Sequence, residues 1–152
     1  MADSAGPGRT VTPIPFAGDL GAAGARARAA GGPAPLHLIL FSATGCPFCE
    51  TVRAQHLRHL VGTSHDRHPL LVSEVLIDRD DPLTGFDGRP TTAKAFARAR
   101  GFRFAPTVAV FDVDGRRLGK PIVGALLEDF YGAYLDQLLD EAAAAARAAA
   151  DR

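Results

Sequence analysis

The chain contains only two cysteines, Cys46 and Cys49, and nothing but Pro47 and Phe48 separates them. A disulfide between residues this close in sequence closes almost no loop, so it adds little stability. The fold must therefore be held by an apolar core, and the 47% hydrophobic content of the 152 residues is sufficient for one. Because a structural bridge would gain so little here, we interpret the cysteine pair as a reactive one.

Length and composition predict a single domain. Residues 1–15 are rich in Gly, Pro, Ser and Thr, and we expect a flexible leader there, followed by one domain over 16–149 and a tail over 150–152. The leader has no positive start followed by an apolar run, so it does not read as a signal peptide. Met1 is either native or replaces a removed export signal, and the residues leave both alternatives open.

Charge and hydropathy exclude two classes of partner. The formal net charge is zero, whereas proteins that bind nucleic acids usually carry a basic face, so we expect no nucleic-acid partner. No stretch reaches about 18 consecutive apolar residues, so we expect no membrane span.

The order of the predicted elements indicates an α/β fold. Residues 36–41 form a short apolar run typical of a buried strand, and a helix is expected to start after it, at Cys46 or Pro47. Strands separated by helices usually pair in parallel, which predicts a central mixed four-stranded sheet flanked by helices, with an extra N-terminal helix. The other predicted helices cover 20–30, 91–100 and 126–149, and the other strands cover 70–77, 107–111 and the segment that ends at residue 123.

Two segments carry weaker signals. Residues 78–90 contain three aspartates before Phe86 and are predicted to be a surface loop. The last helix is expected to fray beyond Glu141, because its alanines have little to bury. Its apolar face is predicted to comprise Leu126, Leu127, Phe130, Tyr134, Leu135, Leu138 and Leu139.

The spacing of the cysteines suits reversible disulfide formation. Residues three apart in a helical turn have Cβ atoms about 5–6 Å apart, which is close to what a disulfide tolerates. At the start of a helix, unpaired N–H groups favour negative charge, so Cys46 is expected to supply the thiolate. Cys49 lies one turn deeper and is expected to be more covered. We therefore predict that Cys46 attacks a substrate disulfide and that Cys49 resolves the mixed disulfide.

A zinc site is the alternative interpretation of the same pair. A closed site would need two further ligands, which could only be histidines, and candidates follow downstream. Pro47 and the preceding strand favour the redox interpretation, so we predict no metal and no cofactor other than the redox-active disulfide. The candidate histidines are His56, His59, His65 and His68.

A proline before the third predicted strand is the second informative feature. Pro106 stands just before an apolar β run, a place where a cis peptide bond is plausible. The residues alone equally allow an ordinary trans proline that begins a strand.

Several of these segments, in this order, resemble the thioredoxin superfamily. The resemblance spans about residues 36–139 and is strongest to exported bacterial thioredoxin-like proteins encoded with sulfur-oxidation genes. The segments that carry it are Phe41-Ser42-Ala43-Thr44-Gly45-Cys46-Pro47-Phe48-Cys49, Val75-Leu76-Ile77-Asp78, Ala105-Pro106-Thr107, Asp114-Gly115 and Val123-Gly124-Ala125-Leu126.

The resemblance implies roles for specific residues. It implies that Pro106 is cis and lies beside the cysteines, and that Ala105, Pro106 and Thr107 form the segment that binds substrate, with the Ala105 backbone pairing to an extended substrate strand. It also implies that the dipeptide of Pro47 and Phe48 tunes the redox potential.

The chain departs from the superfamily pattern where a buried acid is expected. Thioredoxins carry that acid six residues before the first cysteine, and here the position is Leu40. The lysine that usually accompanies the acid corresponds to Glu74. Our hypothesis is that Glu74 accepts the proton of Cys49, with Glu50 as a weaker candidate. The alternative is that Glu74 is an ordinary exposed strand residue.

The predicted function is a protein disulfide oxidoreductase that reduces protein disulfides. Its expected partners are protein disulfide or dithiol substrates and an upstream thiol reductase, and we expect a monomer. The alternatives are a dithiol oxidase or isomerase, or a redox-sensing or metal-binding module on the same fold. We expect a periplasmic location, with the cytoplasm as the alternative.

Overall fold

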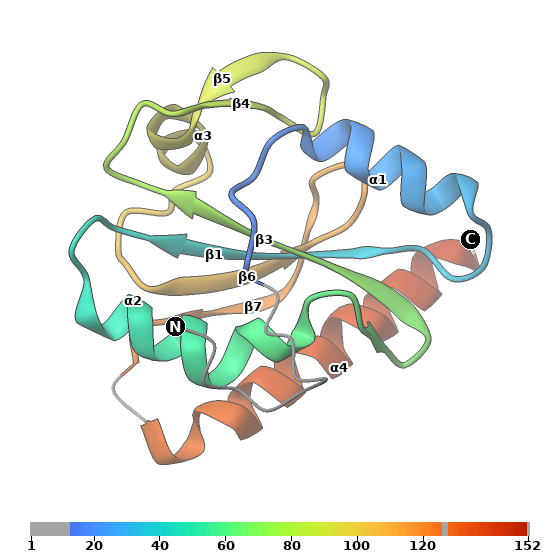
Figure 1. Cartoon of the computed structure of the whole chain (residues 1–152). Helices are drawn as coiled ribbons and strands as arrows, with labels where there is room; N and C mark the ends of the chain where they lie inside the picture. Colours follow the sequence, from blue (N-terminus) through green and yellow to red (C-terminus); the bar gives the residue numbers. More distant parts are fainter. Residues whose placement is uncertain (1–12, 126–127, 152) are drawn as a thin grey trace, which may run out of the picture.

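A mixed five-stranded sheet forms the centre of the protein in a computed structural model that describes residues 13–125 and 128–151 (Figure 1). Its strand order is β2-β3-β1-β6-β7. The predicted α/β fold is confirmed, although the sheet has one short strand, β2, more than the four that were predicted. The strands are β1 (Leu36–Ser42), β2 (Ser64–His65), β3 (His68–Leu76), β6 (Thr107–Phe111) and β7 (Arg117–Val123).

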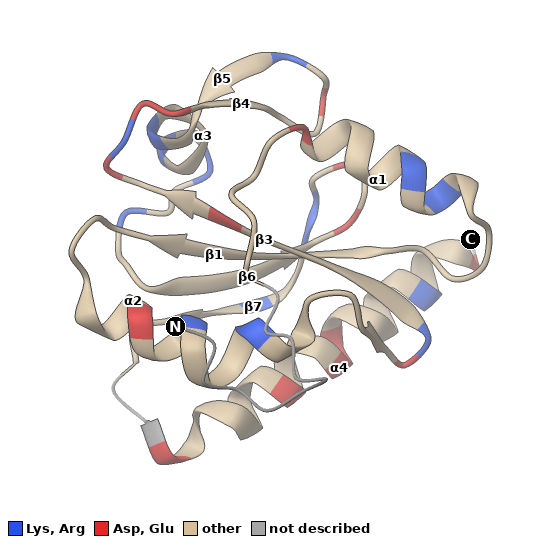
Figure 2. Cartoon of the chain, in the orientation of Figure 1, with Lys and Arg blue, Asp and Glu red and all other residues tan. Residues whose placement is uncertain are grey.

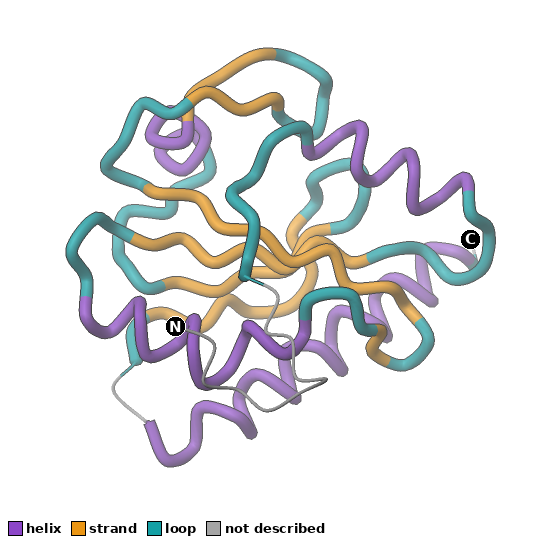
Figure 3. Tube along the Cα trace, viewed as in Figure 1, coloured by secondary structure: helices purple, strands orange, loops and turns teal. Residues whose placement is uncertain are grey.

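Helices cover both faces of the sheet (Figure 3). On one face lie α1 and α3, and on the other lie α2 and α4 (Figure 1). The helix that follows the cysteines changes geometry along its length, because α2 passes into a π-helical turn and then a 3-10 turn. The bounds are α1 (Leu20–Ala29), α2 (Pro47–Val52), the π turn (Arg53–Leu57), the 3-10 turn (Arg58–Leu60), α3 (Ala93–Ala99), a second 3-10 turn (Glu128–Phe130) and α4 (Tyr131–Ala150).

The direction of β6 differs from the prediction. β1 pairs with β3 in parallel, as expected, but β6 pairs antiparallel with both β1 and β7. The connection from β3 to β6 begins and ends at the same end of the sheet, because Val75 and Thr107 both pair with Phe41. β6 therefore runs in the direction opposite to β3.

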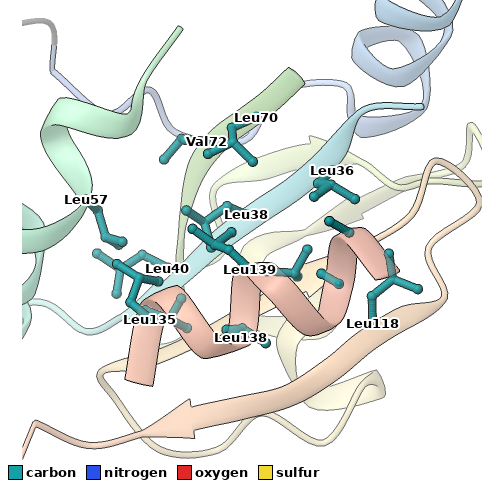
Figure 4. Packing of buried hydrophobic residues seen from close by; sticks show 14 of the residues in the cluster. Leu36, Leu38, Leu40, Leu57, Leu70, Val72, Leu118, Leu135, Leu138 and Leu139 are labelled. Atoms are coloured by element: carbon teal, nitrogen blue, oxygen red, sulfur yellow. The ribbon is translucent and has the colours of Figure 1, made fainter. Parts of the chain in front are cut away.

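Strand β1 is buried along its whole length. Its side chains alternate between the two faces, so that Leu38 belongs to the cluster under α2 and α4, while Ile39 belongs to the cluster under α1 and α3. Leu36, Leu38 and Leu40 pack against Leu135, Leu138 and Leu139 of α4 (Figure 4). Burial on both faces explains why this strand reads as an unbroken apolar run.

The segment predicted as a surface loop contains a second, small sheet. Strands β4 (Pro82–Thr84) and β5 (Pro90–Thr92) pair antiparallel, so the prediction of a plain loop over 78–90 is wrong. Leu83 is buried in the core cluster, and the Phe86 ring packs against Phe111 with 5.6 Å between centroids. These two apolar side chains hold the hairpin on the domain.

The end of α4 is ordered by burial. Ala142, Ala143 and Ala146 are all in the core cluster, so the expectation of a frayed alanine tail is wrong. The small alanine side chains let the helix backbone approach the sheet closely. The buried contact that the prediction assigned to larger side chains is therefore made by alanines. Within the predicted apolar face, Leu135, Leu138 and Leu139 are buried, whereas Phe130 and Tyr134 are exposed; Leu126 and Leu127 lie outside the described residues.

Residues before α1 run along the edge of β3. The first twelve residues of the expected leader lie outside the described residues. Ile14 is buried in the core cluster, and Phe16 forms a parallel bridge with Glu74. The Ala17 N–H donates to the Glu74 carbonyl, and the Glu74 N–H donates to the Pro15 carbonyl, both at 2.9 Å. This segment therefore covers one edge of the central sheet.

Basic and acidic residues are interspersed over the elements of the protein (Figure 2). In the part of the chain that the structure describes, no helix is both long and apolar enough to cross a membrane.

His37 is a buried titratable group in the central strand. Its side chain is 1% exposed, and its Nε2 atom has no hydrogen-bond partner among the described residues. Burial lowers the pKa of His37 to about 4, although the nearby Asp112 charge acts in the opposite direction. The folded protein therefore holds this imidazole neutral.

We predict that His37 makes the fold sensitive to mild acid. Its folded pKa is below the unfolded value of about 6.5, so the unfolded chain binds the proton more readily. The stability should be complete above pH 6.5 and fall as the pH approaches 4, by up to about 3 kcal/mol from this residue. Urea unfolding between pH 7 and 4.5 should show a smaller loss for His37→Phe than for the native chain. The same change at the exposed His59 is the control, and parallel curves for all three proteins would refute the prediction.

Candidate active site

The turn after β1 places Cys46 at the start of α2. Gly45 has φ +70°, a left-handed conformation that glycine adopts without strain, and Cys46 is the N-cap residue of the helix. The turn is tied to the end of β3, because the Thr44 N–H donates to the Asp78 carboxylate at 3.1 Å. Desolvation raises the pKa of Asp78, but the hydrogen bonds from Thr44 outweigh it and the net pKa is lowered.

Cys46 and Cys49 form a disulfide across the first turn of the helix, with 5.2 Å between their Cα atoms. Cys49 is completely buried, whereas Cys46 is partly exposed. The backbone N–H of Cys49 donates to the Cys46 sulfur at 3.1 Å. Cys46 is therefore the sulfur that a partner can reach, and a backbone donor already points at it.

Pro47 and Phe48 lie between the two cysteines at the surface. Pro47 occupies the first helical turn, where its missing N–H costs nothing. The Phe48 side chain is 63% exposed. An aromatic ring this exposed is available to a partner that approaches the disulfide.

The segment before β6 reaches the same end of the sheet. Thr107 pairs with Phe41, so Pro106 lies beside the end of β1, from which the chain continues to Cys46. The Ala105–Pro106 peptide bond is cis. Pro106 is buried and Ala105 is partly exposed. The Thr107 hydroxyl donates to the Phe104 carbonyl at 2.7 Å, which holds the segment in a tight turn.

Glu74 is buried in the sheet, with an exposed fraction of 3%. Its carboxylate accepts hydrogen bonds from Arg53 Nε at 2.9 Å and from Arg53 Nη2 at 2.5 Å. The Ser42 hydroxyl donates to the same carboxylate at 2.5 Å. The alternative of an exposed strand residue is therefore wrong. Glu74 forms a bidentate ion pair with the helix that carries the cysteines.

The buried acid of this chain lies on the strand next to the one that carries the buried acid in the superfamily. Leu40 is fully buried, and its partner across the sheet is Glu74. The acid is thus displaced by one strand, from β1 to β3, and the cation comes from the π turn after α2. The hydrogen bond to Glu74 raises the pKa of Arg53 further, against the opposing effect of its partial burial.

Glu50, the weaker candidate for the proton acceptor, lies at the surface. Its side chain is 71% exposed and forms an ion pair with Arg53 Nη1 at 2.9 Å. Arg53 thus links an exposed acid to a buried one. Sequence reasoning missed the roles of Arg53 and Ser42, because Arg53 belongs to no motif and Ser42 was noted only as part of the segment before the cysteines. The only signal was the lone acid Glu74 within a mostly apolar strand.

The four histidines considered as zinc ligands have separate environments. His65 pairs with Asp140 at 2.7 Å, and His68 bonds the Ala34 carbonyl at 2.7 Å. The His56 ring lies tilted against the Tyr131 ring with 4.6 Å between centroids, and His59 is exposed. Over residues 13–125 and 128–151, no group of three or more His, Cys, Asp or Glu side chains is arranged to hold a metal ion.

Comparison with known proteins identifies the family. The thioredoxin-like domain family matches residues 22–139. A thioredoxin from Malassezia sympodialis has a similar structure, with a TM-score of 0.51 and 16% identity over 90% of this chain and 98% of its own. A structure described as DsbH oxidoreductase has a TM-score of 0.51 and 10% identity over 91% and 96%. A mutant thioredoxin from Halobacterium salinarum has a TM-score of 0.46 and 19% identity over 87% and 96%.

The two structures with a TM-score of 0.51 support the fold alone, since their sequence identities are only 16% and 10%. No curated protein matches the chain.

We predict that the site does not tolerate the loss of one member of the Arg53–Glu74 ion pair alone. Removing one member of a buried pair leaves the other charge uncompensated, so Arg53→Leu should cost about 3 kcal/mol in the free energy of unfolding. Denaturant unfolding of the oxidised protein measures this.

The matched control is Arg79→Leu. Arg79 pairs with Asp81 at 3.2 Å, and both side chains are more than half exposed, so its loss should cost less than about 1 kcal/mol. The double variant Arg53→Leu with Glu74→Leu should recover most of the stability, because no charge is then left buried. Equal losses for Arg53→Leu and Arg79→Leu would contradict the prediction.

Proposed function

Since the chain belongs to the family of thioredoxin-like domains, we propose that it is a thiol–disulfide oxidoreductase that reduces protein disulfides. The observation that carries the proposal is the arrangement of the two cysteines. The reachable Cys46 sulfur accepts a backbone hydrogen bond and lies within disulfide distance of the buried Cys49. A thiolate at Cys46 would be stabilised by that donor, which favours it as the attacking group.

The reaction requires no group beyond the two cysteines and the substrate disulfide. The Cys46 thiolate attacks one substrate sulfur, and an S–S bond to Cys46 forms as the substrate S–S bond breaks. The electron pair leaves on the second substrate sulfur, which takes a proton from solvent. The Cys49 thiolate then attacks the Cys46 sulfur and expels the first substrate sulfur, which is also protonated. The substrate gains two electrons and two protons, and an upstream thiol reductase restores the protein dithiol.

Exposed apolar side chains around the disulfide support a protein substrate. Phe104 is 71% exposed and precedes Ala105, and Val123 is 62% exposed and pairs with Thr107. Phe104 and Val123 therefore flank the segment in which the Ala105 backbone would bind an extended substrate strand, and the exposed Phe48 lies between the two cysteines. Exposed apolar groups of this size are typical of contact surfaces between proteins.

The remaining parts of the proposal rest on the sequence resemblance. We propose that the protein acts as a monomer in the periplasm, with the cytoplasm as the alternative. We also propose that its nearest kin are the exported bacterial proteins encoded with sulfur-oxidation genes. Mass measurement in solution and localisation of the natural gene product test these points.

The reduction potential of the Cys46–Cys49 pair tests the direction of electron flow. We predict a value of about −230 mV or lower, as in thioredoxin-type reductants, measured by equilibration with glutathione or a reference thioredoxin. A value near about −120 mV would make the protein an oxidant and reverse the direction. In parallel, Cys49→Ser should accumulate a mixed disulfide with substrate and Cys46→Ser should not. If neither variant differs from the native chain, the oxidoreductase proposal fails.

We further propose that Glu74 assists the deprotonation of Cys49, either directly or through its effect on the helix. Glu74 points to the same face of the sheet as α2, because Leu70 and Val72 of the same alternating set lie in the cluster under that helix. Loss of a positioned proton acceptor typically slows such a step by about 100-fold or more.

We predict that Glu74→Gln slows resolution of the mixed disulfide near neutral pH and moves its pH profile to higher pH. Rapid-quench trapping of the mixed disulfide between pH 5 and 9 measures the step. Glu50→Gln is the control and should retain the native profile, because Glu50 lies in solvent. If the profiles of Glu74→Gln and the native chain superimpose, Glu74 has only a structural role.

A further inference from the structure

A groove with a volume of about 1150 Å³ opens beside Cys46. It lies on the β3 side of the central strand, since Glu74 and Leu76 of β3 line it together with Cys46 and Pro47. Pro106 lies on the other side of β1, because β6 is the neighbour of β1 away from β3. The groove is therefore separate from the segment at which the Ala105 backbone would bind substrate, yet it ends at the same sulfur.

One wall of the groove is apolar. Ile14, Phe16 and Leu76 line it, and Phe16 is 63% exposed although it is held in place by its bridge to Glu74. A large aromatic side chain that is left open to solvent on a backbone held at the sheet edge is typical of contact surfaces. The segment that precedes α1 thus supplies a preformed apolar wall next to the reactive cysteine.

The lining of the groove also carries a surplus of positive charge. Arg53, Arg58 and Arg79 line the groove, against the two acids Glu50 and Glu74. Both acids are engaged by Arg53. Arg58 makes no ion pair with any residue in the described part of the chain, so its charge is available to a ligand. Arg79 is held only by an exposed pair with Asp81, which a ligand could replace at small cost.

We propose that this groove binds an extended segment of the substrate protein that carries an apolar residue and an acidic residue beside its disulfide. The proposal rests on the proposed function and adds a substrate class to it. The apolar residue packs on Phe16 and Leu76, and the carboxylate pairs with Arg58. A volume above the usual range for small-molecule pockets favours a polypeptide segment over a small disulfide. Arginine and aromatic side chains are also the residues most enriched at protein interfaces.

Two synthetic peptides test the charge preference. Each contains the same intramolecular disulfide, and the flanking positions carry Glu in one peptide and Lys in the other. With the native protein reduced beforehand by dithiothreitol and mixed with each peptide in a single turnover, the second-order rate constant should be higher for the Glu peptide, and the preference should weaken as salt is raised. Arg58→Glu should reduce the ratio of the two rate constants by about fivefold or more, because it converts an attraction into a repulsion.

The control substitution is Arg26→Glu. Arg26 is exposed on α1 and does not line the groove, so the ratio should stay at its native value although the net charge changes equally. The proposal is overturned if the Arg58→Glu and Arg26→Glu proteins show the same ratio.

A binding measurement separates this proposal from the proposed function. Fluorescently labelled peptides with serine in place of both cysteines cannot react, and their anisotropy reports docking alone. Tighter binding of the Glu peptide to the native protein than to Arg58→Glu supports the groove proposal, even if neither disulfide peptide is reduced. Failure to reduce both disulfide peptides would by itself contradict the reductase proposal. Equal binding of the Glu and Lys peptides to the native protein would overturn the groove proposal and leave the reductase proposal standing.

Discussion

The burial of β1 on both faces is the constraint on which the rest of the structure depends. A strand covered on both sides has no polar face, so its alternate side chains must fill two separate cores, as Leu38 and Ile39 do. Its register with β3 and β6 is then strongly specified, because a shift of one residue would exchange the two sets of side chains. This rigid strand ends at Ser42, four residues before Cys46. The position of the reactive sulfur is therefore determined by core packing rather than by the turn alone.

A buried acid among apolar side chains needs an oppositely charged partner. Here that partner comes from the helical segment that carries the cysteines. Glu74 would be costly to bury alone, whereas the fork of Arg53 satisfies its carboxylate with two hydrogen bonds. Buried ion pairs add little net stability compared with apolar packing, so retention of this one is better explained by positioning than by stability. The pair ties the π turn after α2 to β3. It thereby couples the orientation of the helix that carries both cysteines to the sheet beneath it.

Features encoded by neighbouring residues were predictable from the sequence, and features that depend on distant contacts were not. The apolar run of β1, the proline after Cys46 and the capping Thr92 of α3 are local signals, and each element appears where they indicate. The antiparallel direction of β6 depends on the end of the sheet to which the long connection from β3 returns, and the hairpin around Leu83 depends on burial against a remote face. The burial of the α4 alanines likewise could not be predicted without knowing where the sheet lies. In the site, the cysteine pair was evident, whereas Arg53 was invisible until the fold brought it to Glu74.

The strand order also explains how one sulfur can be approached from two sides. Because β1 lies between β3 and β6, the turn that follows it is flanked by one surface at each neighbouring strand. In the proposed function, a substrate strand would pair with the Ala105 backbone on the β6 side, next to the exposed Phe104 and Val123. On the β3 side, the groove lined by Phe16 and Arg58 would recognise side chains rather than backbone. Backbone pairing accepts almost any sequence, whereas charge and shape discriminate among sequences. Under these two proposals, generality and selectivity would reside on opposite sides of Cys46, so either could change without disturbing the chemistry between them.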